Sequence, residues 1–146
     1  MFALSDQPLD VQAVTDSVRD VRAGAVVLFL GTVREFTGDV QTDRLEYEAY
    51  PEMALQVMQQ LETDACERWP LIAVSMVHRT GVLDPGETAV AVAVSSAHRT
   101  AAFEAGQWLI DTLKVRVPIW KKERYSDGRE EWVDPTAALP ASGDVR

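Results

Sequence analysis

The sequence has little cysteine and histidine, and this scarcity excludes several kinds of site. One cysteine, Cys66, cannot form a disulfide within the chain, and one cysteine with two histidines cannot build a zinc cluster. The Walker phosphate loop and the motifs GxGxxG, GxSxG and HExxH are all missing from the sequence. We therefore expect no nucleophilic triad, no metal site and no cofactor.

Positive charge and long apolar runs are also scarce. The chain has 14 Lys and Arg against 23 Asp and Glu, which gives a net charge of -9. Nucleic-acid modules and proteins that bind anionic membranes are usually basic, so we expect neither partner. No apolar run approaches a bilayer span, and the first ten residues do not resemble a secretory signal. Together with the lone cysteine, these absences predict a cytoplasmic protein. An acidic surface can still hold a local cationic pocket.

The apolar content is sufficient for one ordinary domain. Of 146 residues, 47% are apolar and 25% are charged, which is typical of a globular protein. The sequence from 134 to 146 has no apolar period, and we predict a mobile tail there. The domain is then predicted to occupy residues 1–133.

Apolar periodicity predicts three helices. Valines at helical spacing indicate a short first helix, and prolines mark the start or the end of the two longer ones. The predicted helices cover approximately residues 11–18, 51–69 and 100–115.

Runs rich in β-branched residues predict the strands. The run 25–31 is expected to be buried, 45–50 to be half-buried and 88–96 to be central in its sheet. A further strand is predicted at 71–79, and 119–133 is predicted to form a hairpin. We interpret 32–44 as a loop or loose hairpin. Pairs of neighbouring strands between helices favour an α+β domain with a largely antiparallel sheet over a doubly wound parallel one.

Several basic residues follow strands or lie at helix ends, where functional sites are often located. Arg34 follows a predicted strand, whereas His98 and Arg99 lie where the central strand meets a helix N-terminus. Lys114 ends that helix. Because a helix N-terminus attracts anions, His98 and Arg99 indicate a phosphate site.

Each of these residues also has a purely structural interpretation. Lys114 could simply complement the helix dipole. Lys121 and Lys122 are adjacent on a strand and face opposite sides, so one of them should point inward. For His78 and Arg79 we favour structural roles, and the four tryptophans are most simply core or interface residues. Cys66 is expected to fill the core.

Taken together, six segments resemble one known family. The segments FLGTVR, LEYEAY, HRTGVLDPGE, SSAHRTAAFEAG, LKVRVPIWKKE and a final WV occur in order between about residues 24 and 133. They resemble the large, catalytic subunit of molybdopterin synthase. SSAHR together with LKxxxPIWKKE is a specific signal because several unrelated positions must match at once.

The resemblance implies a fold, a reaction and partners. The fold would be the α/β-hammerhead type of α+β domain. The substrate would be cyclic pyranopterin monophosphate, which would receive two sulfurs to form the dithiolene of molybdopterin, a step of molybdenum cofactor biosynthesis. Sulfur would come from a small ubiquitin-like subunit with a C-terminal Gly-Gly thiocarboxylate. Two large subunits would form a central homodimer, with a small subunit at each end of a heterotetramer.

The resemblance also implies site residues. Lys114 and Lys121 match the catalytic lysines of the family. The substrate-binding positions matched in this sequence are Thr32, Val33, Arg34, His98, Arg99, Lys114, Lys121, Lys122 and Glu123. These residue types suit the reaction, since two anionic reactants need fixed positive charge to be brought together.

Two other functions fit the sequence less well. A silent module that only docks a ubiquitin-like partner would not need Arg34, Lys114 and Lys121 together. A phosphatase-like enzyme acting on another cyclic phosphate lacks the usual metal ligands here.

Overall fold

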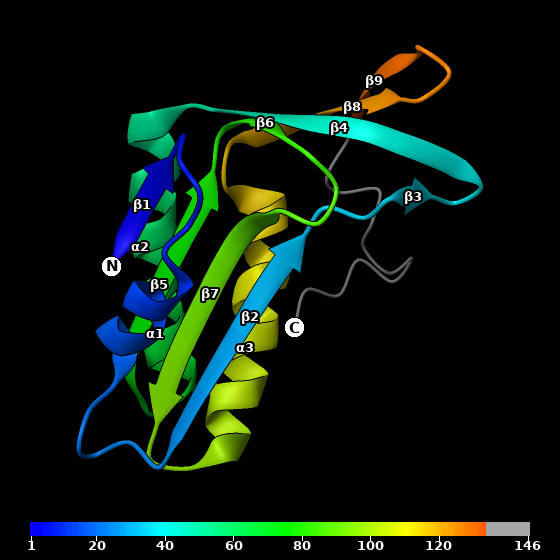
Figure 1. Cartoon of the computed structure of the whole chain (residues 1–146). Coiled ribbons are helices and arrows are strands. Elements are labelled where there is room, and N and C mark those ends of the chain that lie inside the picture. Colours follow the sequence, from blue (N-terminus) through cyan, green and yellow to red (C-terminus); the bar gives the residue numbers. More distant parts are fainter. Residues whose placement is uncertain (134–146) are drawn as a thin grey trace.

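A four-stranded sheet forms the body of the molecule in the computed structural model, which describes residues 1–133 (Figure 1). The strand order is β1 (Phe2–Ser5), β5 (Leu71–Arg79), β7 (Thr88–Ser96) and β2 (Ala25–Thr32). β1 and β5 run parallel, whereas the other neighbours are antiparallel. The tail predicted for 134–146 lies outside the described residues.

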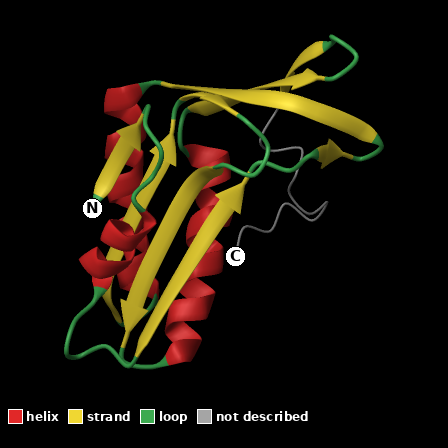
Figure 2. Ribbon diagram, viewed as in Figure 1, coloured by secondary structure: helices red, strands yellow, loops and turns green. Residues whose placement is uncertain are grey.

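Helices cover both faces of this sheet. The long helices α2 (Pro51–Arg68) and α3 (Arg99–Arg116) pack on one face and enclose the main apolar core (Figure 2). The short helix α1 (Val11–Val18) packs on the other face over β5 and β7. No helix within residues 1–133 is both long and apolar enough to span a membrane.

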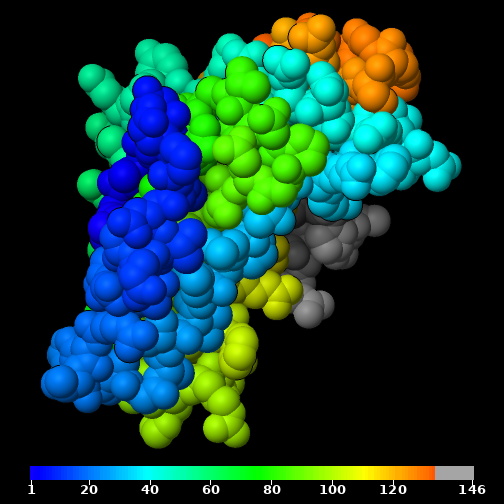
Figure 3. All heavy atoms as spheres, viewed as in Figure 1, coloured from blue at the N-terminus to red at the C-terminus, as the bar shows by residue number. Residues whose placement is uncertain are grey.

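A second set of strands crosses one end of the body. It contains β3 (Phe36–Thr37), β4 (Val40–Ala49), β8 (Ile119–Tyr125) and β9 (Glu130–Val133), while β6 (Gly81–Leu83) also pairs with β4. In the space-filling view these cyan and orange strands project beyond the body (Figure 3). The predicted α+β class with largely antiparallel strands is confirmed, as is the central place of β7.

The structure differs from the strand predictions in three places. β2 is an edge strand with Val26 and Leu30 more than one-third exposed, so the prediction of a buried strand was wrong. The eight-residue α1 is too short to cover it. By contrast, the interpretation of 32–44 as a loop or loose hairpin is confirmed, because β4 begins at Val40 and pairs with β3 in a hairpin. β1 and β6 were not predicted, because segments of four and three residues carry too little periodicity to indicate a strand.

Cys66 is exposed, which contradicts its predicted place in the core. The core face of α2 consists of Ala54, Met58, Leu61 and Ala65. Cys66 comes one residue later, and each residue turns a helix by about 100°, so its side chain leaves that face. Among the tryptophans, Trp108 is buried in the core, whereas Trp120 and Trp132 are about half exposed.

Candidate active site

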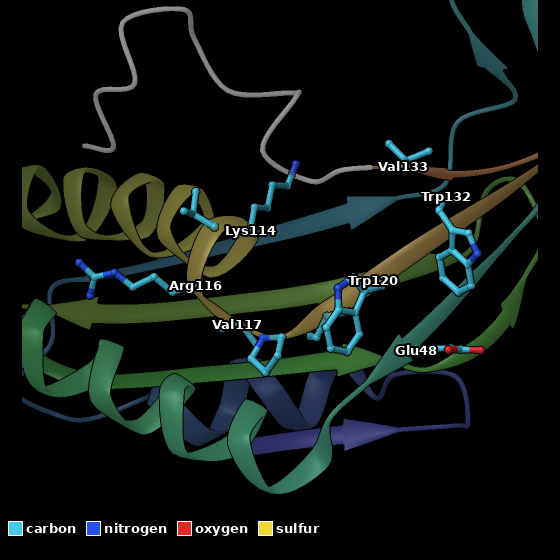
Figure 4. A pocket seen from close by; sticks show the side chains of 10 residues that line it. Glu48, Lys114, Arg116, Val117, Trp120, Trp132 and Val133 are labelled. Atoms are coloured by element: carbon cyan, nitrogen blue, oxygen red, sulfur yellow. The ribbon is translucent and has the colours of Figure 1, made fainter.

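Lys114 lines two pockets. It is exposed in the last turn of α3. One pocket of about 700 Å³ lies between the end of α3 and strands β8 and β9, with Lys114, Glu48, Trp120 and Trp132 in its lining. Figure 4 shows Lys114 extending from α3 away from Trp120 and Trp132.

The second pocket, of about 590 Å³, is a groove between β2 and α3. Its lining includes Phe29, Phe103 and Gly106, and it also includes Lys114. Gly106 has no side chain, so β2 and α3 approach closely there, and an added Cβ would contact Val27 at 3.5 Å. A single lysine is therefore accessible from two separate pockets.

The two adjacent lysines of β8 face opposite sides, as predicted. In the β4–β8 register, Lys121 is opposite Tyr47 and Lys122 is opposite Glu46. Lys121 shares its face with the buried residues Ile119 and Glu123, so it is the lysine on the inner face. Lys122 lies on the outer face, where its Nζ is 3.1 Å from Glu130 and 5.7 Å from the Trp132 ring centroid.

Glu123 is a buried carboxylate beside Lys121. Its side chain is only 5% exposed, and its Oε1 lies 3.5 Å from the Nζ of Lys121. Its Oε2 accepts a 3.1 Å hydrogen bond from the hydroxyl of Thr37 on β3. Burying a charge is costly unless it is paired and hydrogen-bonded. Both conditions are met here, so Glu123 fixes the charge of Lys121 at this position.

The segment Thr32–Arg34 is held by the turn between β6 and β7. Val33 donates its N–H to the carbonyl of Glu87 and accepts from the N–H of Gly86. Its side chain is buried with Leu45 and Leu83. Val33 therefore packs in the core, while its neighbours Thr32 and Arg34 are exposed.

The ion pair between Arg79 and Glu87 stabilises the same turn. The buried Arg79 donates to Glu87 at 3.2 Å, and Glu87 accepts from the N–H of Asp84 at 2.7 Å. These two interactions hold the pKa of Glu87 below its usual value, with the Asp84 N–H contributing most. Arg79 thus has the structural role that the sequence favoured, since it fixes the backbone that carries Arg34.

His98 and Arg99 lie at the opposite end of α3 from Lys114. His98 occupies the N-cap position without a side-chain capping bond, and both residues are exposed. Fifteen residues separate Arg99 from Lys114, which at the helical rise is about 22 Å of backbone. The structure therefore brings Lys114 and Lys121 to one end of the molecule and leaves His98 and Arg99 at the other (Figure 1).

Comparison with known proteins identifies the family of this chain. The sequence pattern of the MoaE protein family matches residues 4–116. The chain is 46% identical over 132 residues to the molybdopterin synthase catalytic subunit of Bacillus subtilis, covering 90% of this chain and 83% of that one. The chain belongs to the MoaE family.

Solved structures of MoaE-family proteins share the fold. The molybdopterin synthase crystal structure from Staphylococcus aureus superposes with a TM-score of 0.85 at 41% identity, covering 89% of this chain and 94% of that one. The MoaE protein of Burkholderia ambifaria gives a TM-score of 0.80 at 34% identity, covering 97% and 93%. The fold that the resemblance implied is therefore confirmed.

One signal for the site in this MoaE-family chain was missed in the sequence. Its only lysines are Lys114, Lys121 and Lys122, and the eleven other basic residues are arginines. All three lysines lie in the nine-residue stretch 114–122, and because lysine can lose its proton far more readily than arginine, this placement marks the stretch as a candidate site. No group of three or more His, Cys, Asp or Glu in the described part of the chain could hold a metal ion.

Proposed function

We propose that this chain is the catalytic subunit of a molybdopterin synthase, a sulfurtransferase that converts cyclic pyranopterin monophosphate to molybdopterin. Two small ubiquitin-like subunits, each with one C-terminal thiocarboxylate, give up one sulfur each and end as carboxylates that take their new oxygen from water or from the substrate. The cyclic phosphate opens, and the two sulfurs form the dithiolene. The position of Lys114 in the lining of two pockets supports this proposal most directly, since the reaction must bring two separate reactants to one group.

The charges at this end of the molecule suit anionic reactants. A phosphorylated pterin and a thiocarboxylate repel each other, so fixed cations are needed to hold them in contact. Arg34 is exposed and has no ion pair within residues 1–133. Its guanidinium can therefore bind phosphate or pterin oxygens in a bidentate manner.

The two lysines receive different roles. Lys114 activates the substrate or transfers protons, because it is exposed to both pockets. Lys121 contacts the thiocarboxylate and the acyl–sulfur intermediates from the inner face of β8. Thr32, Val33, Lys122 and Glu123 complete the proposed substrate-binding set. Glu123 acts through its ion pair to Lys121, and Val33 acts through the backbone hydrogen bonds that hold its exposed neighbours.

The small subunit delivers its C-terminal Gly-Gly tail to the Lys114 region. An extended glycine tail is narrow, and the groove of about 590 Å³ between β2 and α3, whose lining includes Lys114, is the space proposed for it. The relatives are named as catalytic subunits, a name that fits an enzyme with a second, separate subunit.

Each active site is shared between two copies of the chain. His98 and Arg99 lie about 22 Å along α3 from Lys114, which is too far for one small substrate to bridge comfortably. A two-fold axis can place the start of one α3 beside the end of the other. In this arrangement His98 and Arg99 of one protomer bind the substrate held by Arg34, Lys114 and Lys121 of its partner.

The test is direct conversion of the substrate. The purified chain is mixed with a thiocarboxylated small subunit and cyclic pyranopterin monophosphate, and dithiolene product is measured. Product must depend on both the chain and the thiocarboxylate. Its absence with folded, correctly assembled protein would contradict the proposed function.

A further inference from the structure

Two aromatic side chains near Lys121, those of Tyr47 and His78, have no part in the site described above. His78 is the penultimate residue of β5 and is 5% exposed, and Tyr47 lies near the end of β4 and is half-buried. Their ring centroids are 4.9 Å apart with the planes at 70°, an edge-to-face contact. This contact joins the body sheet to the strands that carry Lys121.

His78 is fixed in orientation and uncharged. Its Nδ1 lies 2.7 Å from the carbonyl oxygen of Arg79, and because a carbonyl only accepts, Nδ1 carries the proton. Burial lowers the pKa of His78 to about 4 against the opposing effect of this hydrogen bond, with a smaller contribution in the same direction from the positive charge of Lys114. The imidazole is therefore a neutral ring held rigidly by the backbone.

Tyr47 contacts the fixed His78 ring and lies opposite Lys121 in the neighbouring strand. Tyr47 and Lys121 are directly opposed in the antiparallel β4–β8 pair, so their side chains share one face with Cβ atoms about 5 Å apart. Burial and the charge of Glu123 raise the pKa of Tyr47 to about 12, so its phenol is neutral. Its hydroxyl makes no hydrogen bond within residues 1–133, which leaves the ring itself as its contribution.

We propose that His78 and Tyr47 are positioning residues for Lys121, an inference that rests on the proposed sulfur transfer for its catalytic meaning. The Tyr47 ring, held edge-on by His78, limits the Lys121 side chain on one side, and Glu123 limits it on the other. The lysine is thereby kept in one position relative to the reactants. Because both rings are neutral, they add no charge that would compete with the anionic reactants for the lysine.

Tyr47 variants separate the ring from the hydroxyl. Tyr47→Leu removes the aromatic surface, and we expect kcat to fall roughly tenfold to a hundredfold, since small misplacement of a reacting group has effects of this size. KM should stay within about twofold, because binding energy common to ground and transition states is not removed. Tyr47→Phe keeps the ring and should recover most of the loss. Thermal unfolding shows whether each variant is folded.

The position of Lys121 can be observed without any activity. Protein labelled with 13C-lysine gives signals from only three residues, which Lys114→Arg and Lys122→Arg variants assign. Beside the Tyr47 ring, the two ε-CH2 protons of Lys121 should differ in chemical shift. In Tyr47→Leu they should merge, and in Tyr47→Phe they should stay separate.

A double variant tests whether the two rings act as one unit. His78→Gln removes the ring that holds Tyr47, so it should lower kcat in the same way, and the Tyr47→Leu/His78→Gln protein should lose little more than the worse single variant. Losses that multiply would show that the two residues act separately and would overturn the proposal.

Unchanged Lys121 signals in folded Tyr47→Leu would also overturn it. If the wild-type protein transfers no sulfur, the proposed function fails, yet the lysine signals still decide whether these rings position Lys121.

Discussion

The Nζ of Lys121 lies 3.5 Å from Oε1 of Glu123, two residues further along the same face of β8. The Lys121 side chain is 28% exposed, and that of Glu123 is almost fully buried. The buried carboxylate is also bonded to Thr37, so it cannot move to meet the lysine. Lys121 is therefore the lysine of β8 whose position the fold determines, whereas Lys122 pairs with Glu130 on the outer face.

The first prediction compares these two adjacent lysines. Lys121→Gln should reduce sulfur transfer at low donor concentration much more than Lys122→Gln, because only Lys121 lies on the inner face. The measurement is the initial rate against the concentration of thiocarboxylated small subunit. Each variant removes one positive charge, so equal losses would show that net charge matters and that the face of the strand does not.

The second prediction concerns Lys114. Lys114→Ala should nearly abolish product formation and leave the fold intact, because an exposed residue in the last helical turn makes few core contacts. Losing its favourable interaction with the helix dipole should cost about 0.3–1 kcal/mol of stability. Turnover and urea unfolding should be measured on the same preparation. Wild-type turnover in the folded variant would refute the catalytic role.

The third prediction is a pH dependence of stability that arises from His78. Its pKa is about 4 in the folded protein, below the ordinary value of 6.5. Between these two values the unfolded chain binds a proton on this ring and the folded chain does not. The free energy of unfolding should therefore fall as pH decreases from 6.5 to 4, by roughly 3 kcal/mol from this group alone.

The control for this dependence is His78→Gln, which cannot take up the proton. Urea unfolding at several pH values should give a shallower loss of stability for the variant than for the wild type. Carboxylates titrate in both proteins, so the difference between the two curves isolates the imidazole. Parallel curves would show that His78 is protonated in the folded state as readily as in the unfolded state.

Strong local patterns in the sequence were sufficient to predict much of the fold. The long helices, the central strand β7 and the hairpin of β8 and β9 were all predicted, and each has strong periodicity or a turn signal. The exposure of β2 could not be predicted, because it depends on how far α1 extends over the sheet. Cys66 was misplaced because one residue of helical rotation separates the core face from solvent.

The candidate site was predicted as a set of residues but not as an arrangement. Alternation along β8 predicted that one of Lys121 and Lys122 would face inward, and only the register with β4 shows which one. The contact of Tyr47 with His78 joins strands from two different sheets, and no local sequence pattern encodes it. The distance along α3 followed directly from the sequence, because helical rise is constant.

The fourth prediction tests the shared site by complementation. Homodimers of Arg99→Ala and of Lys114→Ala should each be nearly inactive. In a mixed dimer one site carries both lesions and the other carries neither, so about half the activity per mixed dimer should return. Subunit exchange must first be demonstrated with differently tagged chains. If exchange occurs and no activity returns, each site lies within one chain.

The most direct test of the central claim follows both ends of the sulfur transfer in one reaction. The chain is mixed with thiocarboxylated small subunit and cyclic pyranopterin monophosphate, and mass spectrometry records the donor while dithiolene product is quantified. The account predicts that two thiocarboxylates become carboxylates for each dithiolene formed, and that Lys114→Ala stops both changes together. Donor that keeps its sulfur, or loses it without forming dithiolene, when incubated with folded wild-type protein would contradict the account.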